Sequence, residues 1–126
     1  MPRYDTSSYE PPAPVALVTL RNPHGSQEVS GVPMLIDSGA DVSLVPSDPV
    51  GRLGVETEAG KSYQLVGFDG TESLAVSVNL HLIFAKRVFR GQFLITDQDT
   101  GVLGRNVLNA LKLILDGPRL DWEISR

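Results

Sequence analysis

The chain contains no cysteine, and this absence excludes several kinds of chemistry. None of its 126 residues can form a disulfide, ligate zinc through a thiolate or act as a cysteine nucleophile. The two histidines, His24 and His81, show no partner spacing that indicates a zinc site. We therefore expect no metal and no cofactor, and we interpret both histidines as structural.

Excess positive charge and long apolar runs are also missing. The net charge is −4, whereas binding to nucleic acid requires a basic surface, so we expect no nucleic-acid partner. No apolar run approaches the length of a membrane span, and the N-terminus lacks the apolar core of a signal peptide. These features predict no membrane partner and a cytoplasmic protein, or a domain cut from a larger one.

The chain length suits one compact domain, preceded by a short tail. Residues 1–14 are polar and end in the proline-rich segment Glu10–Pro14, which predicts a flexible tail. Residues 15–126 form the predicted domain.

Alternating apolar residues and turn signals predict that this domain is mostly β. We expect hairpins over residues 15–36, 61–84 and 113–124, with further strands over residues 42–46 and 87–95. In the second hairpin, one face should be buried, because apolar residues alternate at Leu74, Val76, Val78, Leu80 and Leu82. Residues 47–54 are rich in turn formers and predict one helical turn, and Asn106 is the predicted N-cap of a short helix.

The stretch from Leu35 to Asp41 is the strongest candidate for a functional site. Leu35 and Ile36 read as the end of a buried strand, and Asp37 follows directly. Gly39 allows a tight turn, so the carboxylate would be held at the strand end. A carboxylate in such a place is a plausible catalytic group. Asp-Ser-Gly is also an ordinary turn sequence, and that interpretation stays open at this point.

Two segments resemble the signatures of the retropepsins, the retroviral-type aspartic proteases. Residues 35–41, Leu-Ile-Asp-Ser-Gly-Ala-Asp, resemble the active-site motif of that family. Residues 102–108, Val-Leu-Gly-Arg-Asn-Val-Leu, resemble its second signature, which opens the C-terminal helix. Both occur once and in the expected order. The resemblance implies a mostly β, single-domain retropepsin-like fold with one short C-terminal helix, closed by homodimerisation.

The resemblance also implies an activity, namely aspartic endopeptidase. Such enzymes hydrolyse peptide bonds with a water activated between two carboxylates that share a proton. This chain has one Asp-Ser-Gly, so the second Asp37 would come from another copy on the two-fold axis of a homodimer. The implied partners are a peptide or protein substrate and a second copy of the chain.

Roles for individual residues follow from the same resemblance. Asp37 is the implied catalytic residue, and Asp41 and Arg105 match an ion pair that ties the active-site loop to the C-terminal helix. The residues implied to support the active site are Ser38, Gly39, Ala40, Asp41 and Arg105. The residues implied to bind substrate are Leu35, Thr100 and Val102, together with Gly67, Phe68 and Gly70 at the tip of a flap that closes over the peptide.

Other interpretations remain beside this one. The hairpin over residues 61–84 is also compatible with an ordinary sheet hairpin. The whole chain is compatible with a non-catalytic peptide-binding or dimerisation module of the same fold, because fold does not determine function. A metal-binding β domain is disfavoured, because neither Asp97–Gly101 nor Asp37–Asp41 has the ligand spacing of an EF-hand loop.

Overall fold

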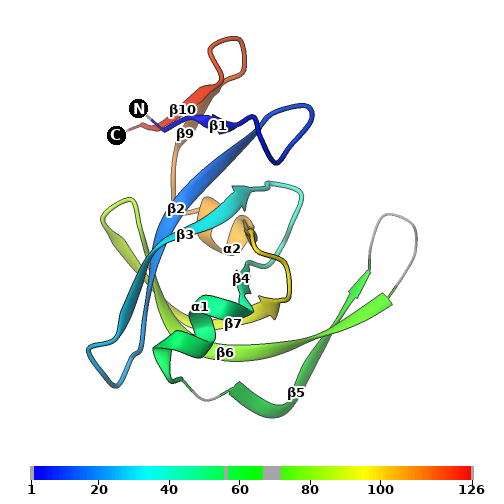
Figure 1. The fold of residues 1–126 in the computed structure, drawn as a ribbon, viewed down its shortest axis with the longest axis vertical. Coiled ribbons are helices and arrows are strands. Elements are labelled where there is room, and N and C mark those ends of the chain that lie inside the picture. Colours follow the sequence, from blue (N-terminus) through cyan, green and yellow to red (C-terminus); the bar gives the residue numbers. More distant parts are fainter. Residues whose placement is uncertain (1, 56, 67–71, 126) are drawn as a thin grey trace.

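A computed structural model describes residues 2–55, 57–66 and 72–125, except for the side chains of 57–66 and 72–75. These residues form ten strands and two helices (Figure 1). The strands are β1 (Tyr4–Asp5), β2 (Ala13–Arg21), β3 (Glu28–Ile36), β4 (Leu44–Pro46), β5 (Thr57–Val66), β6 (Glu72–Phe84), β7 (Arg87–Thr96), β8 (Gly101–Leu103), β9 (Leu113–Asp116) and β10 (Asp121–Ile124). The helices are α1 (Ser47–Leu53) and α2 (Arg105–Leu108).

Eight of the strands form one sheet that closes on itself. Its order is β1-β2-β3-β8-β4-β7-β6-β5, and an additional pairing of β2 with β6 joins strands β2, β3, β8, β4, β7 and β6 into a ring. Within this ring, β8 lies between β3 and β4, parallel to the first and antiparallel to the second. Because β3 and β4 flank the loop that carries Asp37, this arrangement brings the two sequence signatures together.

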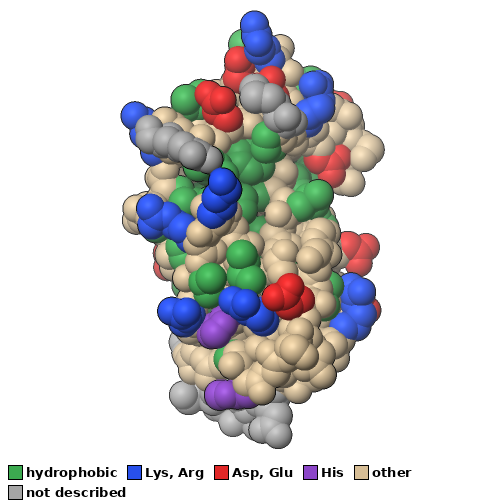
Figure 2. Space-filling view, turned by 90° about the vertical axis from the view of Figure 1, so that its left-hand side faces the viewer, with side chains coloured by type: hydrophobic (Ala, Val, Ile, Leu, Met, Phe, Trp, Pro, Cys, Tyr) green, Lys and Arg blue, Asp and Glu red, His purple; other side chains and the backbone are tan. Residues whose placement is uncertain are grey.

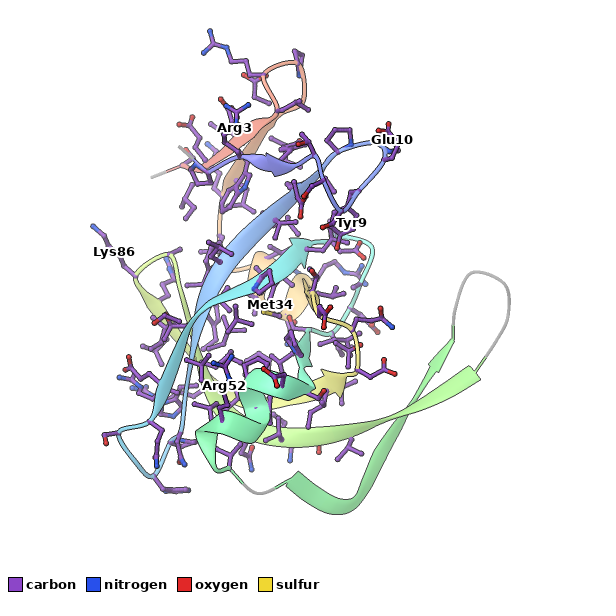
Figure 3. All side chains as sticks on the ribbon, viewed as in Figure 1. Arg3, Tyr9, Glu10, Met34, Arg52 and Lys86 are labelled. Carbon is purple, nitrogen blue, oxygen red and sulfur yellow. The ribbon has the colours of Figure 1, made fainter. Side chains whose placement is uncertain are left out.

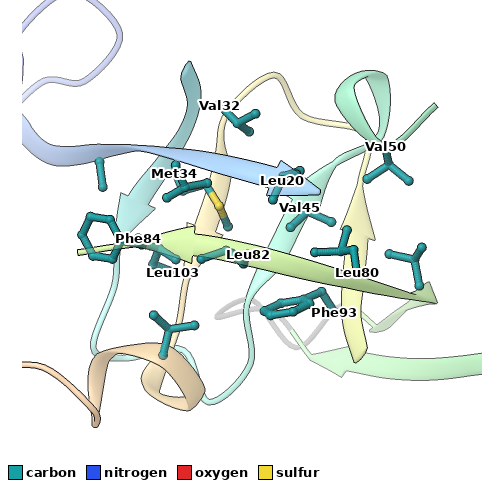
Figure 4. Close-up of a cluster of buried hydrophobic side chains, with 14 of the residues drawn as sticks. Leu20, Val32, Met34, Val45, Val50, Leu80, Leu82, Phe84, Phe93 and Leu103 are labelled. Atoms are coloured by element: carbon teal, nitrogen blue, oxygen red, sulfur yellow. The ribbon is translucent and has the colours of Figure 1, made fainter. Parts of the chain in front are cut away.

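The interior of the ring is a hydrophobic core, to which the strands contribute the side chains of alternate residues (Figure 4). Val78, Leu80 and Leu82 of β6 are fully buried, as the alternation of the sequence predicts. Burial of each such side chain contributes roughly 1.5–3 kcal/mol. Val76 is 43% exposed, contrary to that prediction, because it pairs with β5, where the β5–β6 hairpin extends away from the ring (Figure 1).

The predicted hairpins are confirmed. β2 pairs with β3, β5 with β6 and β9 with β10, all antiparallel. Helix α1 is longer than the single turn predicted, because Pro49, Val50 and Leu53 bury one face of it and Gly54, at φ 69°, ends it in a left-handed conformation. Neither helix of the described residues is long and apolar enough to cross a membrane.

The prediction that Asn106 caps α2 is wrong. Gly104 occupies the N-cap position, and Asn106 lies inside the helix. Its side-chain oxygen accepts a hydrogen bond from Ser43 instead. At the start of this helix, the Arg105 N–H donates to the Ala40 oxygen of the neighbouring loop, so this N–H group needs no side-chain cap.

The N-terminal segment differs from the flexible tail expected for residues 1–14. Residues 4 and 5 form β1, which pairs with β2, and Arg3 forms an isolated bridge with Asp121 of β10. The backbone N–H of Tyr4 donates to the Leu120 oxygen at 2.8 Å. Figure 3 shows Arg3 beside the β9–β10 hairpin. The polar composition of the tail gives no hint of these pairings, because backbone groups make them.

Strands β9 and β10 form a separate two-stranded sheet, here called the terminal sheet. Hydrophobic side chains gather on one face of the molecule near this terminal sheet (Figure 2). A groove of about 620 Å³ lies there, lined by Leu17, Phe84, Trp122 and Ile124 among others. Leu17 is 68% exposed, whereas Trp122 is buried, with its ring centroid 6.0 Å from that of Phe84. The surface around the terminal sheet therefore carries an exposed apolar patch of the kind that marks interaction sites on soluble proteins.

Candidate active site

Asp37 stands directly after β3, where the backbone turns. Its own N–H donates to the Leu103 oxygen of β8 at 3.0 Å, which fixes the strand end. One oxygen of its half-buried carboxylate, Oδ1, accepts a hydrogen bond of 2.9 Å from the backbone N–H of Gly39. A Cβ atom at Gly39 would lie 3.1 Å from that oxygen, so any other residue would crowd the carboxylate. The turn thus holds the carboxylate in one position through backbone contacts.

The start of α2 lies against the same turn. The backbone N–H of Arg105 donates to the Ala40 oxygen at 2.8 Å. A Cβ atom at Gly104 would collide with the Val42 oxygen and would lie 2.9 Å from the Ala40 oxygen. Only glycine permits this close approach of two backbone segments. The glycine of the second signature therefore brings α2 into contact with the Asp37 loop.

Ser43 joins the two signatures from the interior. It is 1% exposed, and its hydroxyl accepts a hydrogen bond from the Gly104 N–H at 2.9 Å and donates one to Asn106 Oδ1 at 2.7 Å. Sequence reasoning missed this residue. The available signal was a serine within the apolar run Val42–Pro46, which was predicted to be a strand.

The predicted pair of Asp41 and Arg105 is not observed. Both residues are exposed, and no ion pair joins them in the part of the chain that the structure describes. The Arg105 guanidinium instead donates from Nη1 to the Ser38 oxygen at 2.7 Å. Arg105 thus does connect α2 to the active-site loop, but through a backbone carbonyl, because the turn points that carbonyl towards the helix.

Three of the residues predicted to bind substrate lie on or next to the adjacent strands β3 and β8, which lead to the Asp37 turn. Leu35 pairs with Val102 across the parallel strands β3 and β8, and both side chains are half-buried. Thr100 immediately precedes β8 and is also half-buried. The predicted flap residues Gly67, Phe68 and Gly70 lie outside the described residues.

No group of three or more histidine, aspartate or glutamate side chains in the described ranges is placed to hold a metal ion. The polar groups that hold Asp37 and its turn are backbone N–H and C=O groups and the Arg105 guanidinium. Such a set can position a carboxylate, and a carboxylate can accept or donate a proton.

Comparison with solved structures identifies the architecture. An EIAV protease, solved as a complex with the inhibitor HBY-793, is similar to this chain with a TM-score of 0.57, over 78% of this chain and 86% of that one. The fold is retropepsin-like. The mostly β, retropepsin-like fold predicted from the sequence is therefore confirmed, and its closure by homodimerisation stays a prediction. Sequence identity in this comparison is 23%, and no protein-family model and no curated protein sequence matches the chain.

Proposed function

We propose that this chain is an aspartic endopeptidase that acts as a homodimer, with one Asp37 from each copy. One observation carries the proposal. On a retropepsin-like fold, the chain presents a single half-buried carboxylate at the end of β3, held by the Gly39 N–H at 2.9 Å. Ser38 and Gly39 beside it are exposed, so the loop has a free surface on which a second copy can place its own Asp37.

The proposed reaction needs two such carboxylates in contact. Two like charges at that distance cannot both be ionised cheaply, so the pair holds one shared proton. The ionised Asp37 removes a proton from a water molecule, which attacks the peptide carbonyl. The protonated Asp37 polarises the carbonyl oxygen and later protonates the departing amine.

The neighbouring residues act on position rather than on protons. Gly39 leaves room for its N–H to reach the carboxylate, and Ala40 anchors the start of α2 through its carbonyl oxygen. Arg105 holds the Ser38 carbonyl, and the exposed Ser38 would brace the equivalent loop of the second copy through its hydroxyl. Asp41 is exposed at the end of this loop, where it is available to the second copy or to substrate.

The proposed substrate is an extended peptide with apolar side chains near the cleaved bond. Leu35 and Val102 offer adjacent apolar side chains next to Asp37, and Thr100 extends that surface. The flap, formed by Gly67, Phe68 and Gly70, remains a prediction from the sequence resemblance.

The experiment that tests this function is cleavage of a peptide library by purified wild type and Asp37→Asn protein across a range of pH. The matched control is Asp48→Asn, since the Asp48 side chain is 87% exposed on α1, outside the proposed site. Wild type and Asp48→Asn should cleave, and Asp37→Asn should fold but not cleave. A folded, dimeric wild type without activity at any pH would favour a non-catalytic peptide-binding or dimerisation module.

A further inference from the structure

Three basic side chains lie side by side on the outer face of the closed sheet. Arg21 of β2 pairs with His81 of β6, and His81 pairs with Arg90 of β7, so all three point to one face. That face is opposite the core, because the next residues along the strands, Leu20 and Leu82, are fully buried. On the face shown in Figure 2, Lys or Arg side chains lie on both sides of a histidine. We call these three residues the basic row.

The basic row is open to solvent and only partly neutralised. Arg90 is exposed, and Arg21 and His81 are half-buried. At one end of the row, Arg21 Nη1 lies 3.7 Å from Glu28 Oε1 of β3. Both partners of this ion pair are partly exposed, so the pair is weak. His81 and Arg90 have no acidic partner in the part of the chain that the structure describes.

Repulsion within the row makes it costly for the chain alone. Like charges directly opposite one another on adjacent strands are unfavourable. Burial lowers the pKa of His81, and the charges of three neighbours lower it further, namely Arg90 on β7, Arg21 on β2 and His24 in the β2–β3 turn. The nearest carboxylate, that of Glu28 on β3, lies beyond Arg21. A bound anion would relieve this repulsion.

Apolar side chains lie next to the basic row on the same face. Two residues further along the strands, Ile83 of β6 pairs with Val88 of β7. Val88 is 38% exposed, and Ile83 is half-buried. Residues two apart in a strand are separated by about 6.6 Å, so one bound segment can contact both rows. A ligand that uses this whole surface must carry acidic and apolar groups side by side.

We infer that the basic row, with Ile83 and Val88, is a docking surface for an acidic amphipathic helix of a partner protein. Adjacent strands lie about 4.8 Å apart, and helical residues three or four apart have Cβ atoms about 5–6 Å apart. A helix lying across β2, β6 and β7 therefore sets one carboxylate against each basic side chain. An extended segment fits less well, because its side chains on one face repeat at about 6.6 Å.

Other anionic partners match this surface less well. Membrane-binding clusters bring about four to eight Lys and Arg to an anionic lipid surface. The basic row has two arginines and one histidine, on a chain with a net charge of −4. The same net charge disfavours nucleic acid. A free phosphate has no apolar part with which to contact Ile83 and Val88. The inference is independent of the proposed function, because the surface lies outside the Asp37 turn.

Binding of a designed peptide tests this surface. The probe is a fluorescent helical peptide of about 20 residues, with glutamates at i, i+4, i+7 and i+11 and a leucine after each glutamate. The matched peptide has glutamine in place of glutamate. Fluorescence anisotropy is measured on the full chain with Asp37→Asn, so that the proposed activity cannot consume the probe. The glutamate peptide should bind at least about tenfold more tightly than the glutamine peptide. Equal affinities, or no binding, would overturn the inference.

Two substitutions in this background test the two parts of the surface. Arg90→Glu should raise the Kd of the glutamate peptide by about tenfold, because an attractive contact becomes repulsive. Its matched control is Arg119→Glu, which makes the same charge change at a side chain that is 77% exposed in the β9–β10 turn. Val88→Ala should raise the Kd by about threefold, and Val76→Ala, elsewhere on the sheet, should not. If Arg119→Glu weakens binding as much as Arg90→Glu, the inference is wrong.

An NMR titration of His81 reports binding at the row itself. The chain has two histidines, so His24→Gln assigns their ring-proton signals. A carboxylate beside His81 favours its charged form, so saturating peptide should raise the pKa of His81. By linkage, affinity should increase as the pH falls from about 7 to about 5, and His81→Gln should remove this increase. A pKa of His81 that saturating peptide leaves unchanged would place the peptide elsewhere and overturn the inference.

Two other anions are tested in parallel, namely vesicles of equal parts phosphatidylcholine and phosphatidylserine, and inorganic phosphate. Neither should compete with the glutamate peptide at low millimolar concentration. Binding of vesicles that Arg90→Glu abolishes, without binding of the peptide, would identify a membrane surface instead. If phosphate raises the pKa of His81 as much as the peptide does, and Val88→Ala leaves peptide affinity unchanged, the row is a small-anion site. Either result contradicts the docking of an acidic helix.

Discussion

Replacing Ser43 by alanine should destabilise the chain through one buried N–H group. The Ser43 hydroxyl is the acceptor for the Gly104 N–H, and both residues are buried. Ser43→Ala leaves that N–H without an acceptor, which costs about 1–3 kcal/mol. The hydroxyl's other partner, Asn106, is exposed, so water can replace the lost hydrogen bond there. We therefore expect a loss of about 2 kcal/mol from a total of roughly 5–15 kcal/mol.

Urea unfolding at fixed protein concentration measures this loss, with the fluorescence of the single, buried Trp122 as the signal. In thermal melts the midpoint should fall by roughly 5–10 °C. Ser77→Ala is the matched control, since Ser77 is equally buried but its hydroxyl has no partner among the described residues. Removal of this unpaired hydroxyl should leave stability unchanged or raise it. Equal unfolding midpoints for Ser43→Ala and wild type, or equal losses for the two variants, would refute the assigned role of Ser43.

Three further variants test other parts of the structure. Gly104→Ala should lower stability by about 1–3 kcal/mol or more, because the new Cβ meets two backbone oxygens; a wild-type urea midpoint would contradict this contact. Arg105→Ala should reduce kcat but cost less than about 1 kcal/mol, since its bond to the Ser38 oxygen is exposed; a loss of about 3–5 kcal/mol would indicate a buried ion pair instead. Burial and the neighbouring Arg90 lower the pKa of His81 below 6.5, so the folded chain binds this proton less tightly than the unfolded chain. Stability should therefore decline as the pH falls below 6.5, and His81→Gln should flatten that decline in urea titrations between about pH 5 and about pH 7; an unchanged slope would rule out His81 as its cause.

The strands were predictable because their signals are local. Alternation along β6 and the turn residues between β2 and β3 predict the hairpins, and both are found. The resemblance at residues 35–41 and 102–108 predicts the fold class, which the structural comparison confirms. These signals depend on residues close together in the sequence.

The contacts that hold the candidate site were not predictable in the same way. Ser43 and Gly104 are 61 residues apart, and no local pattern shows that they meet. The family resemblance implied an ion pair between Arg105 and Asp41, but the turn presents the Ser38 carbonyl to the guanidinium. The order of residues 2–5 likewise depends on backbone pairing with β2 and β10. Each of these features follows from tertiary geometry rather than from residue type.

Mixing wild type with Asp37→Asn protein tests the central claim most directly, namely that one active site uses Asp37 from two copies. The total chain concentration is held constant and well above the dimer dissociation constant, and peptide cleavage is measured after subunits have exchanged. If both carboxylates are needed, activity follows the square of the wild-type fraction, so an equal mixture keeps about one quarter of the activity. If a single chain is sufficient, activity follows the fraction itself and about one half remains, which would contradict the proposed mechanism.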